Sequence, residues 1–537
     1  MRLIIKDYLL QLKEKDELDL LLCDLFLQMG YITDNRPKTG NRQYGVDIRA
    51  HNDDSLVLCT VKQGDLNRRN WDSDPNSVRQ SLNEIHDCYL HFLSNEDRQK
   101  NLRIVVATNG MMDESVSRNW DGFVKENTIW NNIPVTIEFW NIDTITDFVQ
   151  KHLFDEHVFD PNTQSLLRRA LYYIGEPDYP AKYYEQIIDE ALEKIVSTRS
   201  LKERKKILSS VFLATQMIAQ YASEARMYKI AVIVSEYLII RYWHFLFSQN
   251  LFEKNTYVEW LLKFIFVYEK WNRSYYDAIK FVCKGPDRLP SCNNVEQRVI
   301  IYDVLGYLST FAYHLCFKHD ITSQKLCKEI LQDIFALINN YPQFYYPPYD
   351  INISTLSMVF RLLLQFEKKD ELKTLIHNLC NRLALYFQLH KKYPSSLDTF
   401  KDAVDIYMDT STEEYESSAF WGIMLEWIAF TDCKSVYEEV QPFLADTLKG
   451  VTKCVWFLRT EEEQHLYHYY AMNSAGDGVS FEPCSEYNHF LEQTLFVMNQ
   501  YANESFSFDE YSFPSLEFIL ARYFGYLIRV KEKNNNY

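Results

Sequence analysis

The chain has 537 residues, of which 47 % are apolar and 15 % are aromatic. This composition excludes a disordered protein, and the length exceeds that of one ordinary domain, so we expect at least two domains. The 57 basic residues against 74 acidic ones give a net charge of −17. That balance argues against a surface that binds nucleic acid throughout, although it leaves room for a local basic groove.

Eleven cysteines are scattered along the chain, and none shows the C-x-x-C spacing of a zinc site. Several fall within apolar runs, so we expect reduced, buried thiols in a cytoplasmic protein. The N-terminal residues are interrupted by charges every few positions, unlike a signal peptide. The longest apolar stretch, residues 228–247, contains Lys229, Glu236 and Arg241, which favours a buried helix and no membrane partner.

The first 150 residues alternate between helical and strand-like patterns. Helical spacing of apolar residues continues from the N-terminus to about residue 28, where Gly30 ends it. We then expect strands at 31–36, 44–50 and 56–62, a helix at 77–93, a buried strand at 102–108, a helix at 113–126, a strand at 135–140 and a helix at 144–153. A mixed sheet covered by helices is the compact arrangement of this order, so we predict an α/β/α domain over residues 1–158.

Beyond residue 159 there is little strand alternation. Amphipathic helical stretches recur at 181–195, 201–221, 228–248, 257–271, 295–317, 323–339, 353–367, 371–389, 420–430 and 516–529. No fixed repeat length is visible. We predict an irregular, all-helical array over residues 159–537, with one or two sub-arrays, that acts as a sensor or interaction domain.

Residues 45–64 are the stretch of sequence that suggests an active site. If residues 53–54 alone form the turn of a hairpin, Asp47 lies directly opposite Thr60, and Lys62 is one diagonal step away on the same face. A carboxylate and an ammonium group then converge at the end of an apolar strand. Such polar residues are either a solvated strand end or an active site.

Residues 14–150 resemble the PD-(D/E)xK nuclease superfamily, and most closely the Mrr-like restriction endonucleases. The resemblance rests on a leading helix that carries an acid and ends in Met-Gly-Tyr at 29–31, on Gly-Val-Asp at 45–47, and on a strand that ends in Lys62. A helix and a further buried strand follow. The resemblance implies a restriction-endonuclease-like domain with a mixed sheet.

In such enzymes the strand aspartate binds one or two Mg²⁺ ions, and the lysine positions or deprotonates the attacking water. The resemblance therefore implies that Asp47 is the metal ligand and that Lys62 is the catalytic lysine. By its distance from Gly30, Asp19 corresponds best to the acid of the leading helix, with Glu17 as the fallback.

The chain departs from this pattern two residues before Lys62, where the family carries Glu, Asp or Gln and this sequence has Thr60. A hydroxyl group is a poorer Mg²⁺ ligand than a carboxylate. Glu84, on the following helix, is the preferred substitute, and Asp65 is the second choice. The predicted catalytic residues are thus Asp47, Lys62, Asp19 and Glu84, and the predicted metal ligands are Asp47, Glu84 and Asp65.

Basic residues cluster in the same part of the chain and could line a groove for phosphates. They are Arg36, Lys38, Arg42, Arg49, Arg68, Arg69 and Arg79. Trp71 lies among them and could stack on a base. A run of charges is also what an ordinary solvated surface shows.

We therefore expect a Mg²⁺- or Mn²⁺-dependent endonuclease that hydrolyses phosphodiester bonds in nucleic acid, DNA in preference to RNA. The resemblance implies a regulated prokaryotic restriction or anti-phage defence effector, whose helical domain binds a partner protein or forms a homo-oligomer. Because of Thr60, the alternative is a non-catalytic nucleic-acid-binding or scaffolding protein that keeps a degenerate nuclease fold.

Overall fold

The computed structural model describes residues 2–34, 44–74, 76–152, 161–176, 181–285, 293–390, 399–411, 416–457, 477–502 and 515–524, together with the short pieces 159, 179, 288–289, 394–395, 459 and 513. These residues form two compact units, Met1–Trp271 and Asn272–Tyr537. The first unit thus extends beyond the predicted α/β domain, whose expected last residue, 158, lies outside the described residues.

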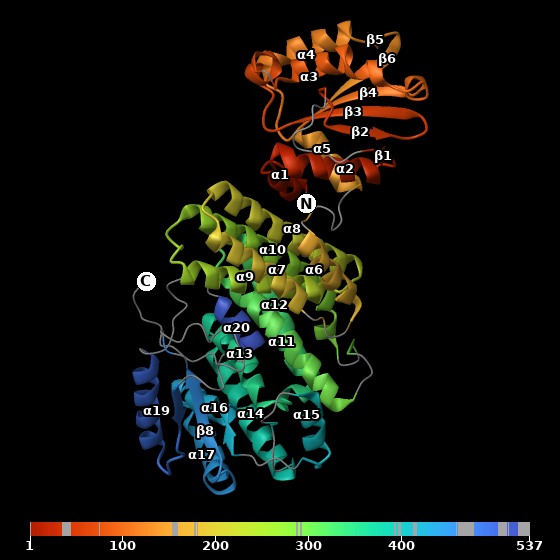
Figure 1. Cartoon of the computed structure of the whole chain (residues 1–537). Helices are drawn as coiled ribbons and strands as arrows, with labels where there is room; N and C mark the ends of the chain where they lie inside the picture. The colour runs from red at the N-terminus through yellow and green to blue at the C-terminus, as the bar shows by residue number, and fades with distance from the viewer. Residues whose placement is uncertain are drawn as a thin grey trace. The chain divides into compact units, whose positions relative to one another are not determined.

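A six-stranded sheet is the centre of the first unit (Figure 1). Its strands, in spatial order, are β1 (Ile32–Thr33), β2 (Ile48–His51), β3 (Ser55–Lys62), β4 (Asn101–Thr108), β6 (Ile133–Trp140) and β5 (Ile129–Trp130). Strand β2 is antiparallel to both of its neighbours, β1 and β3, whereas β3, β4 and β6 run parallel. The predicted mixed sheet is therefore confirmed.

The register of the β2–β3 hairpin is also as predicted. Ile48 pairs with Cys59, and the Asn52 N–H donates to the Ser55 carbonyl at 3.0 Å, so the turn consists of residues 53–54. In this register Asp47, one residue before β2, faces Thr60. A two-residue turn leaves no slack for slippage, and a shift by one residue would reverse every side chain.

Helices cover both faces of the sheet. One face carries α1 (Arg2–Leu9), the π-helical turn η1 (Glu14–Leu18), α2 (Asp19–Gln28) and α5 (Ile142–His152). The other carries η2 (Arg69–Ser73), α3 (Val78–Asp87), η3 (Tyr89–Phe92), η4 (Asp97–Gln99) and α4 (Glu114–Glu126). The two helix layers lie on opposite sides of the strands in Figure 1. The single helix expected up to residue 28 is broken after Leu9.

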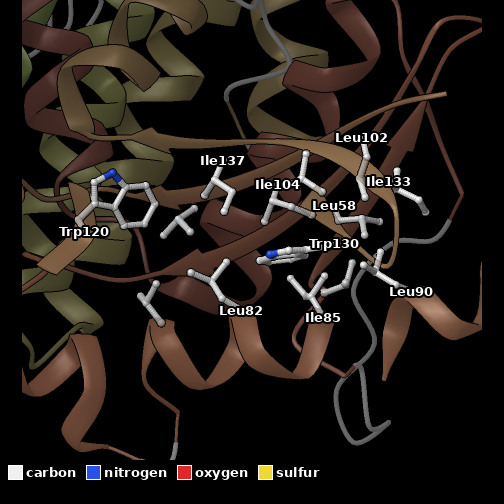
Figure 2. Close-up of a cluster of buried hydrophobic side chains, with 14 of the residues drawn as sticks. Leu58, Leu82, Ile85, Leu90, Leu102, Ile104, Trp120, Trp130, Ile133 and Ile137 are labelled. Carbon is white, nitrogen blue, oxygen red and sulfur yellow. The ribbon is translucent and has the colours of Figure 1, made fainter. Parts of the chain in front are cut away.

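The core beneath α3 and α4 explains why β3 is apolar along its length. Residues 56–61 of β3 are all buried, because each face of this central strand has a helix layer above it. Figure 2 shows Leu82 and Ile85 of α3 pointing towards Leu58 and Ile104 of the sheet. Polar side chains are therefore confined to the strand ends.

The remaining helices of the first unit pack as successive neighbours. They are α6 (Pro161–Tyr172), the short η6 (Tyr173–Gly175), α7 (Lys182–Ser197), α8 (Leu201–Glu224), α9 (Tyr228–Ser248) and α10 (Asn255–Ile279), which continues into the second unit. In addition, α1 packs on α8. The predicted helices at 181–195, 201–221, 228–248 and 257–271 are confirmed.

The second unit is mainly helical. Its helices are η7 (Val282–Lys284), α11 (Asn294–Cys316), α12 (Ile321–Asn340), η9 (Pro342–Tyr345), η10 (Asp350–Asn352), α13 (Ile353–Gln365), α14 (Lys369–His390), α15 (Phe400–Tyr407), α16 (Ala419–Phe430), α17 (Lys434–Pro442), η11 (Phe443–Thr447), α19 (Tyr487–Ala502) and α20 (Leu516–Phe524). The helices predicted from residue 295 onward all occur, although the last one is described only as far as Phe524.

The prediction of an all-helical region is wrong in one place. Strands β7 (Ser417–Ser418), β8 (Thr452–Phe457) and β9 (Asp477–Ser480) form a three-stranded sheet. A Cβ atom on Gly422 of α16 would lie 2.4 Å from the Cys454 carbonyl oxygen, so this helix packs directly on the backbone of β8. The strands are two to six residues long, too short for alternation to reveal them.

Two helices, α9 and α11, have the length and apolar composition that crossing a membrane requires. In the structure, 72 % and 78 % of their most apolar stretches are buried inside the protein. A helix at the centre of a soluble protein shows the same burial. The ten cysteines among the described residues are free thiols.

A close approach between two loops holds the end of β3 beside the end of β4. Gly110, after β4, has no Cβ, and one built there would lie 2.3 Å from the carbonyl carbon and oxygen of Gly64. Thr108 Oγ1 donates to the same Gly64 oxygen. Any side chain at residue 110 would separate the two strand ends.

We expect Gly110→Ala to lower the free energy of unfolding by about 1–3 kcal/mol, because the backbone must move to admit the methyl group. Gly122→Ala is the matched control, since nothing lies within 4 Å of a Cβ at this position in α4. The control should be neutral or slightly stabilising, because alanine favours helices. Calorimetric unfolding of both variants tests the difference; equal destabilisation would contradict the close approach.

Candidate functional site

Asp47 and Lys62 mark the site, at the end of the β2–β3 hairpin where polar residues replace the apolar strand. One oxygen of the Asp47 carboxylate, Oδ2, accepts a hydrogen bond from the Val61 N–H at 2.7 Å and a longer one from Thr60 Oγ1 at 3.3 Å. The aspartate thus caps the end of β3. No hydrogen bond of Oδ1 is found among the described residues, so one carboxylate oxygen remains for a ligand.

Gly45 allows the chain to bring Asp47 to this place. Its φ of +81° is a conformation that residues with a side chain rarely adopt. A Cβ on Gly45 would also lie 2.2 Å from the Ser81 carbonyl oxygen of α3. The segment leading to Asp47 therefore passes directly against the backbone of that helix.

Glu14, the first residue of η1, completes the cluster. Its carboxylate accepts a hydrogen bond from the Gln63 backbone N–H, and the charges of both Lys62 and Asp47 act on it. Burial raises the pKa of Glu14 and outweighs the opposing effect of the Lys62 ammonium, while the negative charge of Asp47 raises this pKa further. The charges of two carboxylates and one ammonium group thus act on one another near the end of β3.

The acids predicted for this role have contacts of their own. Asp19 is 5 % exposed, and its Oδ1 accepts the Leu20 N–H at 2.8 Å. Glu17 binds the Lys206 ammonium of α8 at 2.5 Å and the Lys13 N–H at 2.7 Å. The charges of Asp47 and Lys62 act on Glu14 of η1, an acid that the sequence did not single out.

Glu14 could not be selected from sequence, because counting back from Gly30 along a regular α-helix does not show which acid approaches the sheet. In the structure, α1 ends at Leu9, and the π-helical η1 begins at Glu14 and runs directly into α2 at Asp19. η1 contacts β3, and the only available signal was that Glu14 opens an acidic run.

The substitutes predicted for Thr60 are not brought into the cluster. Asp65 Oδ1 accepts the Met111 N–H at 2.8 Å, which joins two loops. Glu84 is half-buried on α3. Within the part of the chain that the structure describes, no hydrogen bond or ion pair joins either residue to Asp47 or Lys62. Thr60 itself is buried, and its hydroxyl serves Asp47.

A second group of side chains clamps the end of β3 to α1. Asn109 Nδ2 donates to the carbonyls of Leu9 and Leu12, each at 2.9 Å, and Asn109 Oδ1 accepts the Gly64 N–H at 2.8 Å. Gln63 Nε2 donates to the same Leu12 carbonyl at 3.1 Å. These bonds satisfy the open carbonyls at and after the end of α1 and hold the chain just before Glu14 against the end of β3. No motif in the sequence marks Asn109 for this role.

The predicted nucleic-acid-binding residues separate into three classes. Arg49 forms ion pairs with Asp34 and with Asp97, the latter at 2.9 Å, so its charge is already balanced. Arg68, Arg69 and Arg79 are exposed. Arg36, Lys38 and Arg42 lie outside the described residues.

The prediction that Trp71 stacks on a base is wrong. Trp71 is 1 % exposed and lies in the core, with ring centroids 5.9 Å from Trp120 and 5.7 Å from Phe123. An indole in a polar, arginine-rich stretch suggested a surface ring. Burial of such a large apolar surface under α4 stabilises the fold more than exposure would.

The donor groups fit Mg²⁺ better than a transition metal. Among the described residues, no group of three or more His, Cys, Asp or Glu side chains is arranged to hold a metal ion. Zinc sites require three or four protein ligands, whereas Mg²⁺ keeps several waters and binds through one or two carboxylates. Asp47 and Glu14 are the two carboxylates whose charges interact here.

Comparisons with known proteins identified no relative of this chain. No protein-family model matches the chain, and no match was found among the curated proteins or the solved structures.

The stability of the Glu14→Gln variant at different pH values should show how strongly the charged form of Glu14 is disfavoured in the folded protein. A carboxyl whose pKa is raised on folding favours the folded state in its protonated form, so this stability is present at low pH. It is lost as the pH rises from the ordinary value of 4.5 through the raised pKa. The variant should therefore gain stability over the wild type at pH 7 and much less at pH 4.

Urea unfolding at the two pH values measures this difference. Glu126→Gln, at an exposed position at the end of α4, is the control and should show no such gain. A Glu14→Gln variant that is less stable than the wild type at pH 7 would indicate that the attraction of Lys62 exceeds the cost of burial.

Proposed function

We propose that this protein is a metal-dependent nuclease that hydrolyses phosphodiester bonds in nucleic acid, DNA in preference to RNA. The observation that carries the proposal is that Asp47 and Lys62 lie at one end of the β2–β3 hairpin and that the charges of both act on Glu14. The raised pKa of the half-buried Glu14 is typical of residues in functional sites.

The order of elements supports a restriction-endonuclease-like domain. A leading helix, three antiparallel strands, a helix and a further strand parallel to β3 follow one another in this chain. This is the arrangement that the resemblance to Mrr-like endonucleases implies. The Asp47 and Lys62 positions at the end of the hairpin agree with it as well.

Each residue of the cluster has a role in this proposal. Asp47 and Glu14 hold a divalent cation, Mg²⁺ or Mn²⁺, which polarises the scissile phosphate and lowers the pKa of a bound water. Lys62 orients the attacking water and offsets the negative charge that develops on the phosphate. Val61 and Thr60 keep the Asp47 carboxylate in one orientation through their hydrogen bonds.

A non-catalytic nucleic-acid-binding or scaffolding protein is the second candidate. Thr60 favours it, because this buried hydroxyl stands where the family carries a carboxylate or an amide. Under this alternative the domain keeps its fold and its exposed arginines but has lost hydrolysis. A regulated effector in prokaryotic restriction or anti-phage defence, located in the cytoplasm, remains our expectation for the first candidate.

Asp47→Asn and Lys62→Met should each reduce cleavage of plasmid DNA by about 10²- to 10⁴-fold, as loss of a catalytic group does. Asparagine keeps the oxygen that accepts the Val61 N–H, and methionine keeps the apolar stem of Lys62, so both variants should fold. Asp121→Asn and Lys125→Met, exposed on α4, are the matched controls and should cleave normally.

Cleavage is measured with Mg²⁺ or Mn²⁺ on double-stranded DNA, single-stranded DNA and RNA. Cleavage that survives both substitutions would remove the nuclease proposal. A wild-type protein that binds nucleic acid in EDTA and cleaves none with either metal would support the second candidate.

Metal titration decides which acid accompanies Asp47. Glu14→Gln should weaken Mn²⁺ binding at least ~10-fold, because a neutral amide replaces one of only two carboxylate ligands. Glu84→Gln and Asp65→Asn should leave the affinity unchanged. Isothermal titration calorimetry gives the three values, and a loss with Glu84→Gln instead would show that the acid of α3 completes the site.

A further inference from the structure

A hollow of about 520 Å³ lies in the first unit, bounded by the end of α1 and the first turns of α8 and α10. Its volume is within the range of about 300–1,000 Å³ that small-molecule sites occupy. Leu10 follows α1, Leu201 and Lys202 open α8, and Thr256 opens α10. None of these residues belongs to the cluster around Asp47.

Positive charge dominates the lining. Lys202, Lys205 and Lys263 border the hollow, and Glu259 is the acidic residue among its lining residues. The first turns of α8 and α10 add the positive ends of two helix dipoles. An anion in this hollow would therefore gain from three ammonium groups and from the helix ends, against a single carboxylate.

The lysines of this hollow differ from their neighbours on α8 and η1. Lys206 pairs with Glu17 at 2.5 Å and Lys13 pairs with Glu203 at 2.8 Å, so these two ammonium groups hold η1 against α8. By contrast, Lys202 and Lys205 are exposed and form no ion pair with any residue that the structure describes. Two cations three residues apart on one helix repel each other, and a bound anion relieves that repulsion.

An aromatic ring and two leucines form the apolar part of the lining of this hollow. Lys263 Nζ lies 4.4 Å from the centroid of the Trp260 ring, which fixes the ammonium group at the wall of the hollow. Leu10 and Leu201 are 45 % and 51 % exposed. Apolar side chains left this open beside three lysines suit a ligand that has an apolar or aromatic part joined to a charged one.

The geometry points to a binding site for a nucleotide-sized phosphate ester, with the phosphates at Lys202, Lys205 and Lys263 and the apolar part against Leu10 and Leu201. Phosphate oxygens accept several charge-assisted hydrogen bonds at once, and the three lysines that line the hollow carry ammonium donors for them. A single inorganic anion would leave most of the hollow empty. This assignment does not depend on hydrolysis at the Asp47 cluster.

Calorimetric titration of the full chain with ATP in EDTA tests the assignment, since metal-dependent hydrolysis cannot occur there. We expect ATP to bind more tightly than tripolyphosphate, because only ATP reaches the leucines. The combined variant Lys202→Ala, Lys205→Ala, Lys263→Ala should bind ATP at least ~10-fold more weakly, a cost of about 1.4 kcal/mol. Raising the salt concentration should weaken wild-type binding as well.

The matched control replaces three exposed lysines of the same unit outside the hollow, Lys125, Lys151 and Lys254, and changes the net charge equally. Equal ATP affinity of the two triple variants would overturn the assignment, as would absence of ATP binding by the wild type in the millimolar range. A hollow that binds a single-stranded oligonucleotide and neither ATP nor tripolyphosphate would also overturn it, because it would then be part of a nucleic-acid path.

Discussion

The complete burial of β3 is the constraint on which the rest of this site depends. A helix layer covers each face of the strand, so residues 56–61 have no access to water. Polar side chains gather towards the end of the strand, where buried N–H groups still need acceptors. Asp47 supplies one of them through its bond to the Val61 N–H. A carboxylate is thereby held in place by the same hydrogen bonding that ends the strand.

Hydrogen bonds hold the end of β3 in place, although Glu14 is partly buried there and feels the negative charge of Asp47. Asn109 and Gln63 bind the carbonyls that follow α1, and Gly110 lets the two loops touch. As a consequence Glu14 lies near a second carboxylate in a partly buried place, where its charged form is disfavoured. Such a conflict persists only where surrounding contacts impose it, and a divalent cation or a substrate phosphate with its metal would resolve it.

The turn that carries Glu14 connects this cluster to the lysine-lined hollow. Leu10 borders the hollow, Leu12 accepts the hydrogen bonds from Gln63 and Asn109, and Glu14 follows two residues later. Ion pairs from Lys13 and Glu17 tie the same segment to α8. Residues 10–14 therefore border both the candidate anion site and the candidate catalytic end of the sheet.

Much of the architecture was determined by the sequence alone. Hydrophobic periodicity is a local property, so the long helices and the strands β3, β4 and β6 could be located within a few residues, and a two-residue turn determined the register that sets Asp47 opposite Thr60. The short strands β7, β8 and β9 were not predicted, because so few residues cannot show a periodic pattern. Only the tertiary structure decided that Trp71 is a core residue, that Arg49 is neutralised by Asp34 and Asp97, and that the charges of Asp47 and Lys62 act on Glu14. Each of these outcomes depends on contacts between separate segments of the chain, which a local pattern of residues does not specify.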